Sequence, residues 1–370
     1  MAKMFGILNL ESPFVHVEGI EDSRPVSAAS FLGRYRILDF MLSNMTNSHI
    51  SNIELYVKDR PRSTVEHVSG TNYNINTKRG AIHILGGEEY YTNKLYNTDI
   101  ANFRSNMRYI FESKEKYVVI APSYMIYTQD YREMLNYHIE HNADITMLYQ
   151  STSHAKEEFA MCDCLEIGEG KRVLSMRKNR AKHKNRDISL DTYIMSRDLF
   201  IQLIQEATNT SSLYWLRDII LDKLSELNVV AYQHHGYASC INSLKSYFDA
   251  NLKMIDSNNL KSITREDWPI FTRFNDDCPT MYLEDADVQN SIIGNGSIID
   301  GTVIDCVIGR NVKINKGVVL KNCVVLPSSL IEENIEIENA VIDRFVTISK
   351  VKSLKGEFDR PIYVKRGDHI

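Results

Sequence analysis

Long apolar runs are absent from this chain of 370 residues, and its first residues, 1–6, contain no extended hydrophobic stretch. The sequence therefore predicts neither a membrane span nor a signal peptide. Cysteine is scarce, with six residues and no regular framework, which predicts reduced thiols and a cytoplasmic location. The one close pair, Cys162 and Cys164, does not match the usual spacing of zinc ligands, so we expect no metal there.

A strong excess of either charge is also missing, because 43 Lys and Arg residues face 48 Asp and Glu residues. The resulting net charge of −5 gives no electrostatic reason to expect binding to nucleic acid or to a membrane surface. Hydrophobic residues make up 43% of the chain and charged residues 25%, which is typical of a globular protein. The length is sufficient for two domains, each with its own core.

Strand and helix patterns alternate through residues 1–257, which predicts a doubly wound, mostly parallel α/β sheet. The expected strands cover residues 5–10, 52–57, 117–122 and 143–149, with later strands near 171–175, 191–195 and 228–233. The first expected helix begins at Arg36. Further helices are expected at residues 102–112, 129–141, 198–207, 213–226 and 244–256. In such folds, ligands lie at the carboxyl ends of the strands. Residues 258–285 have the composition of a linker.

Helical periodicity is missing from residues 286–370, where apolar residues instead recur every five or six positions. One such series is Ile298, Val303, Ile308, Ile314, Leu320 and Leu326. Gly, Asn, Asp and Lys lie between them, so this spacing predicts the hexapeptide coils of a parallel β-helix. A β-sandwich is the alternative, but the turns recur too closely for hairpins. Residues 324–326 are candidates for burial, either inside the coils or at an interface.

A glycine-bearing turn with two basic residues leads into an amphipathic helix within residues 31–44, F-L-G-R-Y-R-I-L-D-F-M-L-S-N. Ile37, Phe40 and Met41 form an i, i+3, i+4 apolar stripe. Arg34 and Arg36 lie at the entry to this helix, where free backbone N–H groups and positive charge favour an anion. A solvated helix start is the alternative interpretation.

This segment resembles the one that follows the nucleotide loop in bacterial ADP-glucose pyrophosphorylases (glucose-1-phosphate adenylyltransferases). The resemblance runs from Phe5 to about Ile348 and is closest to the GlgD-type subunit, which acts with an active partner. It implies a doubly wound, Rossmann-like nucleotidyltransferase domain in residues 1–257, followed by a C-terminal left-handed parallel β-helix in residues 286–370. It also implies a role in glycogen biosynthesis, in which ATP and glucose 1-phosphate give ADP-glucose and pyrophosphate.

The family's phosphate-binding loop, GGxGxRL, has no counterpart here. Residues 9–19 read N-L-E-S-P-F-V-H-V-E-G, and bulky side chains keep a backbone away from phosphate. In the family's RAKPAxxF segment the arginine remains as Arg24, but the lysine position is Val26. The GTADAV segment is also altered, and its best match is residues 98–103.

The carboxylates that hold Mg²⁺ in the family are missing as well. Anchored on the segments 126–131 and 246–251, these two positions fall on Tyr124 and Cys240. A phenol and a thiol do not replace carboxylates as ligands of a hard cation. We therefore expect no catalytic residue, no metal and no cofactor on this chain, with Mg²⁺ in the partner subunit. The loss of these catalytic groups from a scaffold that is otherwise retained indicates a pseudo-enzyme.

Four basic residues remain as candidates for binding. Lys178 matches the family's lysine that contacts glucose 1-phosphate, and a surface lysine is the alternative. Arg36 matches an arginine that contacts effectors near the domain junction, and Arg34 and Arg24 are neighbours that could assist. For Arg36 the rival interpretation is an ion pair with a helix carboxylate.

The resemblance implies a heterotetramer with a catalytic subunit and regulation by sugar-phosphate effectors, while a homo-oligomer is allowed for the chain alone. The alternatives are a self-sufficient sugar nucleotidyltransferase with unrecognised ligands, or a stand-alone sugar-phosphate sensor. Hexapeptide β-helices also occur in acyltransferases, which generally need a histidine base on the coils. No histidine lies between His235 and His369, which argues against that activity.

Overall fold

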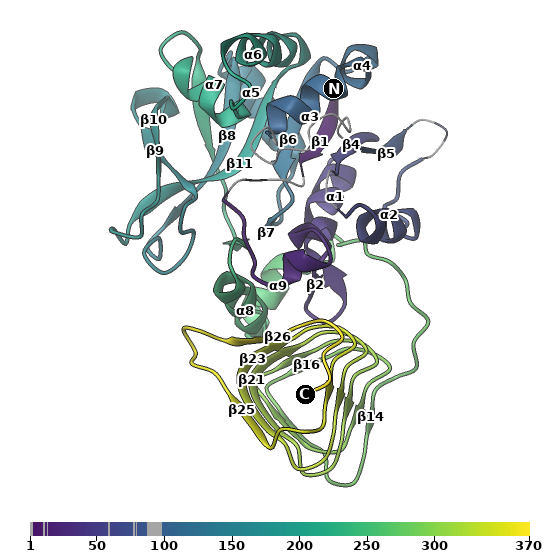
Figure 1. Ribbon diagram of the computed structural model, residues 1–370. Helices are drawn as coiled ribbons and strands as arrows, with labels where there is room; N and C mark the ends of the chain where they lie inside the picture. Colours follow the sequence, from purple (N-terminus) through teal and green to yellow (C-terminus); the bar gives the residue numbers. More distant parts are fainter. Residues whose placement is uncertain are drawn as a thin grey trace.

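A computed structural model describes residues 3–9, 12, 14–57, 60–76, 78, 80–86 and 98–370 of the chain. Figure 1 shows an α/β domain above a coiled C-terminal domain. Within the described residues, no helix is both long enough and apolar enough to cross a membrane. Of the altered phosphate loop, residues 10, 11 and 13 lie outside the part that the structure describes.

The α/β domain is organised around a large sheet in which β6-β1-β4-β5 are all parallel and β5 forms one edge. β11 is antiparallel to both β6 and β8, and β9 and β10 extend the sheet beyond β11. The strands are β1 (Met4–Asn9), β4 (Asn52–Tyr56), β5 (Ala81–Leu85), β6 (Tyr117–Pro122), β8 (Ile145–Thr152), β9 (Asp163–Ile167), β10 (Val173–Lys178), β11 (Arg186–Ser196) and β12 (Val229–Gln233).

Helices cover both faces of this sheet, which confirms the doubly wound prediction. One face packs against α1 (Ile37–Asn47), α2 (Arg62–Ser69) and α5 (Tyr131–Glu140). α8 (Leu244–Lys253) and α9 (Ser257–Ile263) lie between the sheet and the C-terminal domain (Figure 1). The other face packs against α3 (Asp99–Ser105), α4 (Met107–Glu112), α6 (Arg197–Thr210) and α7 (Leu216–Asp222). Two short pairs complete the domain, β2 (Ser30–Phe31) with β3 (Tyr35–Arg36) and β7 (Met125–Tyr127) with β13 (Ala238–Cys240).

The C-terminal domain is a parallel β-helix, as predicted from the hexapeptide spacing (Figure 1). Ile298 pairs with Lys313, Lys313 with Leu330 and Leu330 with Thr347, so successive coils advance by 15 or 17 residues. One set of strands is β14 (Met281–Tyr282), β17 (Ile298–Ile299), β20 (Lys313–Ile314), β22 (Leu330–Ile331) and β24 (Thr347–Ile348). The others are β15 (Asp287–Gln289), β16 (Ile292–Ile293), β18 (Thr302–Ile304), β19 (Val307–Ile308), β21 (Val319–Val325), β23 (Glu336–Ile342), β25 (Ser353–Lys355) and β26 (Ile362–Val364).

Two of the six positions in the predicted apolar series do not face the inside of the coils. Ile298 is only partly buried, because its neighbour Ile299 fills the interior instead. Leu326 is buried, but it packs against the α/β domain together with Val324. Val325, between them, faces the interior of the β-helix. Alternation along the strand therefore assigns Val324 and Leu326 to the junction between the domains and Val325 to the coil core.

The turn between β2 and β3 touches the backbone of the β-helix at Gly33. This glycine has a φ of +65°, and a Cβ added to it would lie 2.5 Å from the carbonyl oxygen of Ile308. We expect Gly33→Ala to lower the free energy of unfolding by about 1–3 kcal/mol more than Gly170→Ala does. Gly170 is the matched control, because its φ is +63° but nothing lies within 4 Å of its added Cβ. Urea denaturation of both variants tests this, and equal losses would contradict a tight contact at the junction.

Candidate functional site

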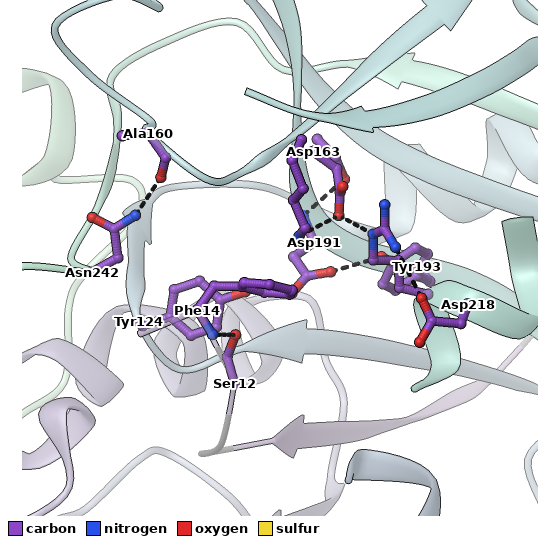
Figure 2. Close-up of polar contacts among 12 residues, drawn as sticks. Ser12, Phe14, Tyr124, Ala160, Asp163, Asp191, Tyr193, Asp218 and Asn242 are labelled. Carbon is purple, nitrogen blue, oxygen red and sulfur yellow. Dashed lines mark hydrogen bonds and ion pairs between the residues drawn. The ribbon is translucent and has the colours of Figure 1, made fainter. Parts of the chain in front are cut away.

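A pocket lies at the carboxyl ends of β1 and β6, where a doubly wound sheet places its ligands (Figure 2). Its walls come from the ends of these strands, from β10, β11 and β13, and from the start of α7. The open volume is about 80 Å³. Pockets that bind small molecules usually span about 300–1,000 Å³. The side chains of this chain therefore fill most of the space that a substrate would need.

The two positions expected for metal carboxylates, Tyr124 and Cys240, do come together in this pocket. Tyr124 follows β6, and its carbonyl accepts a hydrogen bond of 2.8 Å from the N–H of Ile241, next to Cys240. The Cys240 thiol also meets Cys162, and this hydrogen bond together with burial raises the pKa of the Cys162 thiol well above its ordinary value. A thiol and a phenol thus occupy the two positions where the family resemblance requires carboxylates.

Asp191, on β11, fills the pocket next to Tyr124 (Figure 2). Its carboxylate accepts a short hydrogen bond from the Tyr124 hydroxyl and another of 2.7 Å from the Tyr193 hydroxyl. The backbone of Asp191 has a φ of +51°, in the left-handed region, at an irregularity in the pairing of β11 with β8. Burial and the nearby Asp191 raise the pKa of the Tyr124 phenol well above its ordinary value, so Tyr124 remains a proton donor. The carboxylate is thus held by the pocket's own hydroxyl groups.

Lys178, the candidate contact to a sugar phosphate, also lines the pocket. Its Nζ lies 3.0 Å from Asp163 Oδ2, and Arg217 Nε lies 2.6 Å from the same oxygen. The ring of Phe14 covers the ammonium group, with its centroid 3.5 Å from Nζ. The charge of Lys178 is therefore already neutralised within the protein, and 19% of its side chain is exposed.

Aspartates do line the pocket, although sequence reasoning did not find them: Asp99, Asp163, Asp191 and Asp218. Burial raises the pKa of the Asp99 carboxyl to about 7, while the backbone N–H groups of Leu216 and Ile100 donate hydrogen bonds to it. Among the described residues, no three or more His, Cys, Asp or Glu side chains are arranged to hold a metal ion. Mg²⁺ needs a near-octahedral set of oxygen ligands, and this donor set does not fit it.

Val26, at the position of the family's phosphate-contacting lysine, lies in a 3-10 turn (Val26–Ala28) and is 4% exposed. It belongs to the apolar core beneath α1 and brings no charge to the pocket. The loss of the family's lysine could be recognised only from the position of Val26 in the motif.

The three candidate effector arginines lie near the junction of the two domains. The Arg24 guanidinium is buried and bound to Asp343 of the β-helix at 2.7 Å. Arg36 Nη1 donates to the Ser63 carbonyl at 2.6 Å, and burial and the nearby Arg344 lower the pKa of Arg36 to about 10. Arg34 is exposed and stacks on Tyr35, with 5.5 Å between its guanidinium carbon and the ring centroid.

Arg344, from the β-helix, brings further positive charge to this junction. Burial and the nearby Arg24 and Arg366 lower the pKa of its guanidinium. Arginines from both domains therefore repel one another, and an anion that entered between them would relieve this repulsion. Sequence reasoning did not find Arg344, because it lies in a turn that carries no motif.

Comparison with known proteins gives two matching families. Residues 22–257 match the family described as Nucleotidyl transferase, and residues 280–356 match the one described as GlmU-like, C-terminal hexapeptide. The chain is 25% identical over 367 residues to the glycogen biosynthesis protein GlgD of Bacillus subtilis, which covers 99% of this chain and 96% of that protein.

Two further relatives are similar over most of their length. The glycogen biosynthesis protein GlgD of Geobacillus stearothermophilus is 28% identical over 320 residues, covering 86% of this chain and 83% of that protein. The glucose-1-phosphate adenylyltransferase of Desulfitobacterium hafniense (strain Y51) is 26% identical over 325 residues, covering 86% of this chain and 81% of that protein.

Proposed function

Because this chain belongs to the nucleotidyl transferase family, we propose that it is a catalytically degenerate, regulatory subunit of a glucose-1-phosphate adenylyltransferase in glycogen biosynthesis. One observation carries the proposal. The pocket expected to bind Mg²⁺ and substrates contains Tyr124 and Cys240 at the metal positions, and its open volume is about 80 Å³. A phenol and a thiol are poor ligands for a hard cation, and so small a volume leaves little room for a nucleoside triphosphate, so both features support a loss of catalysis.

The charges inside the pocket support the same proposal. Nucleotidyl transfer needs cations and N–H groups aimed at the phosphates, where negative charge develops. Lys178 and Arg217 are instead both bound to Asp163, and Asp191 is bound to two tyrosines. These ion pairs and hydrogen bonds give the charged groups of the pocket partners within the protein, without a ligand. An active partner subunit would supply Mg²⁺ and align glucose 1-phosphate with ATP.

Regulation is the second part of the proposal. Arg36 and Arg344 carry partly buried positive charge between the two domains, next to the exposed Arg34. A sugar-phosphate effector bound there would contact both domains at once. The β-helix offers a surface through which a heterotetramer with catalytic subunits could assemble.

The direct test is ADP-glucose synthesis from ATP, glucose 1-phosphate and Mg²⁺, measured with this chain alone, with an adenylyltransferase partner alone and with both. We expect no turnover by this chain alone, and a raised rate or a shifted sugar-phosphate activation curve in the mixture. Turnover by the lone chain would contradict the loss of catalysis. An unchanged partner rate and activation curve would contradict the regulatory role.

A second candidate is a stand-alone sugar-phosphate sensor, favoured by one feature of the pocket. In the described part of the chain, the buried Oδ1 of Asp163 has no hydrogen-bond partner. A sugar hydroxyl could donate to this oxygen while Lys178 contacts the phosphate. Titration of glucose 1-phosphate into the lone chain distinguishes this sensor, because tight binding without any effect on the partner enzyme would favour it.

A further inference from the structure

A strongly basic loop lies at the edge of the sheet, next to the pocket described above, with which it shares Lys178. Residues 177–186 read R-K-N-R-A-K-H-K-N-R, with six cationic side chains and no acidic one. The loop connects β10 to β11, next to the edge strands β9 and β10 (Figure 1). The whole chain has a net charge of −5, so the other 360 residues carry −11. Positive charge is therefore concentrated locally against an acidic background.

The three carboxylates near this loop each have a partner other than its five exposed cations. Asp163 binds Lys178 and Arg217, Glu166 accepts a hydrogen bond from Ser175 at 2.8 Å, and Asp187 accepts one from Ser151 at 2.6 Å. Within the part of the chain that the structure describes, the only ion pair that any of the six cations makes is that of Lys178. The five others are exposed and lack a counter-charge: Arg177, Arg180, Lys182, Lys184 and Arg186.

The loop is held in place by a buried asparagine, so these cations are positioned by their backbone. Asn179 is 3% exposed, and its Nδ2 donates to the carbonyls of Ala155 at 2.7 Å and Phe159 at 2.9 Å. The carbonyl of Asn179 accepts from the N–H of Met161 at 2.8 Å, and that of Lys184 accepts from Ala155 at 3.0 Å. A pre-organised loop loses little entropy when it binds a ligand.

A groove opens along this loop, with a volume of about 490 Å³. Its walls carry one carboxylate, Glu166, against several basic side chains: Arg177, Lys178, Arg180, Lys182, His183 and Arg186. The corresponding volume of the pocket around Tyr124 and Cys240 is about 80 Å³. The groove has the size of a small-molecule site. Its side chains offer forked guanidinium donors, which match phosphate geometry.

We propose that this groove binds a small ligand with a chain of phosphate groups, such as inorganic triphosphate or the triphosphate of a nucleotide. Several adjacent cations on an anchored loop recognise several adjacent phosphates, whereas a single phosphate would leave most of the cations unpaired. A long polyanion such as nucleic acid is disfavoured, because the other 360 residues carry a net charge of −11 and would repel it. This site does not depend on the proposed regulatory role and differs from the junction arginines.

The test is calorimetric titration of sodium triphosphate into the full chain at a fixed salt concentration. We expect the triple variant Arg177→Gln, Arg180→Gln, Lys182→Gln to bind at least about tenfold more weakly. The matched control is Lys261→Gln, Lys350→Gln, Lys352→Gln, which removes the same charge from exposed positions elsewhere and should change affinity less than about twofold. Equal losses in both triple variants, or no loss in the first, would overturn the proposal.

A pair of single substitutions on the same loop sharpens the test. Lys182 lines the groove and Lys184 does not, although both are exposed. Lys182→Gln should weaken triphosphate binding several-fold and Lys184→Gln should not. Arg36→Ala reports on the junction: a loss of triphosphate binding in this variant, with no loss in Lys182→Gln, would assign the binding to the junction and overturn the proposal. Thermal unfolding of each variant confirms that it is folded.

Competition identifies the source of the phosphates. ATP that displaces triphosphate with similar affinity would show that phosphate groups alone are recognised. Tighter ATP binding that is lost in the Arg177, Arg180, Lys182 variant would assign a nucleotide to the groove. Binding of single-stranded DNA but not of triphosphate would overturn the small-ligand proposal.

Discussion

Replacing Arg24 with methionine is expected to lower the free energy of unfolding by about 3–5 kcal/mol. Arg24 is 2% exposed, and its guanidinium forms two hydrogen bonds to Asp343, of 2.7 and 3.2 Å. In the variant Asp343 retains the Tyr363 hydroxyl and the N–H of Arg344, but its buried charge loses its ion pair. An uncompensated buried charge is far more destabilising than the loss of the pair itself. Urea denaturation followed by circular dichroism measures the change.

A matched control uses an ion pair on the surface. The side chains of Arg62 and Glu66 are 91% and 55% exposed. Arg62→Gln should therefore change the free energy of unfolding by less than about 0.5 kcal/mol. Combining Arg24→Met with Asp343→Leu should recover much of the loss, because both charges then leave the interior. A loss for Arg24→Met as small as the control's would mean that solvent reaches the junction.

Replacing Glu54 with glutamine is expected to stabilise the protein at alkaline pH by about 2–4 kcal/mol and to change little near pH 4.5. Glu54, on β4, is 5% exposed and accepts a short hydrogen bond from the Tyr56 hydroxyl. Burial raises the pKa of its carboxyl from 4.5 to about 7, and the Tyr56 hydrogen bond opposes this only in part. Glutamine keeps an oxygen for Tyr56 and never ionises.

The direction follows from the protons bound in each state. The folded protein holds the Glu54 proton up to about pH 7, whereas the unfolded chain releases it near 4.5. The stability from the protonated carboxyl is therefore fully present below pH 4.5 and is lost as the pH rises through 7. Denaturation of wild type and Glu54→Gln at pH 4.5 and 8.5 measures the difference.

The exposed Glu140 of α5 provides the control for this substitution. Glu140→Gln makes the same chemical change without burial, and its effect should be small at both pH values. An equal effect of Glu54→Gln at the two pH values would mean that the Glu54 carboxyl ionises in the folded protein as it does in the unfolded chain.

Much of the fold could be predicted from sequence because apolar patterning is local. The strand predicted at 117–122 coincides with β6, and the helix predicted from Arg36 is α1, which begins at Ile37. Tertiary hydrogen bonds altered other elements. The single helix expected at 102–112 is broken at Asn106, whose side chain donates to the carbonyls of Asn102 and Gly86. Propensity within the segment does not reveal such a partner.

The edge strand β5 was not predicted, and neither was the pairing of β9 with β10. β5 (Ala81–Leu85) is mostly only half-buried, so its apolar signal is weak. β10 has buried residues only at Val173 and Met176, and the Leu174 between them is exposed. Both elements lie at sheet edges, where patterning that depends on burial fades.

For the site, motif spacing identified Tyr124 and Cys240 because the scaffold on either side of each is retained. Asp191 was missed because residues 188–191 read I-S-L-D, the apolar–polar alternation of an ordinary half-buried strand, so no local pattern marks it. Asp163 and Arg217 were missed because only the tertiary fold brings β9 next to α7. Arg24 was identified as a basic residue with a possible anion partner, but the Asp343 carboxylate lies 319 positions away in sequence.

The same separation has a consequence for the order of events during synthesis. Ribosomes add about 5–20 residues per second, so roughly 16–64 s pass between the appearance of Arg24 and that of Asp343. Throughout this interval the α/β domain can assemble its own sheet, but the segment around Arg24 lacks its counter-charge. The segment around Arg24 is one of the first to leave the ribosome, but it is paired only when the last coils of the β-helix have been made. Until those coils are made, the nascent chain exposes this segment to chaperones.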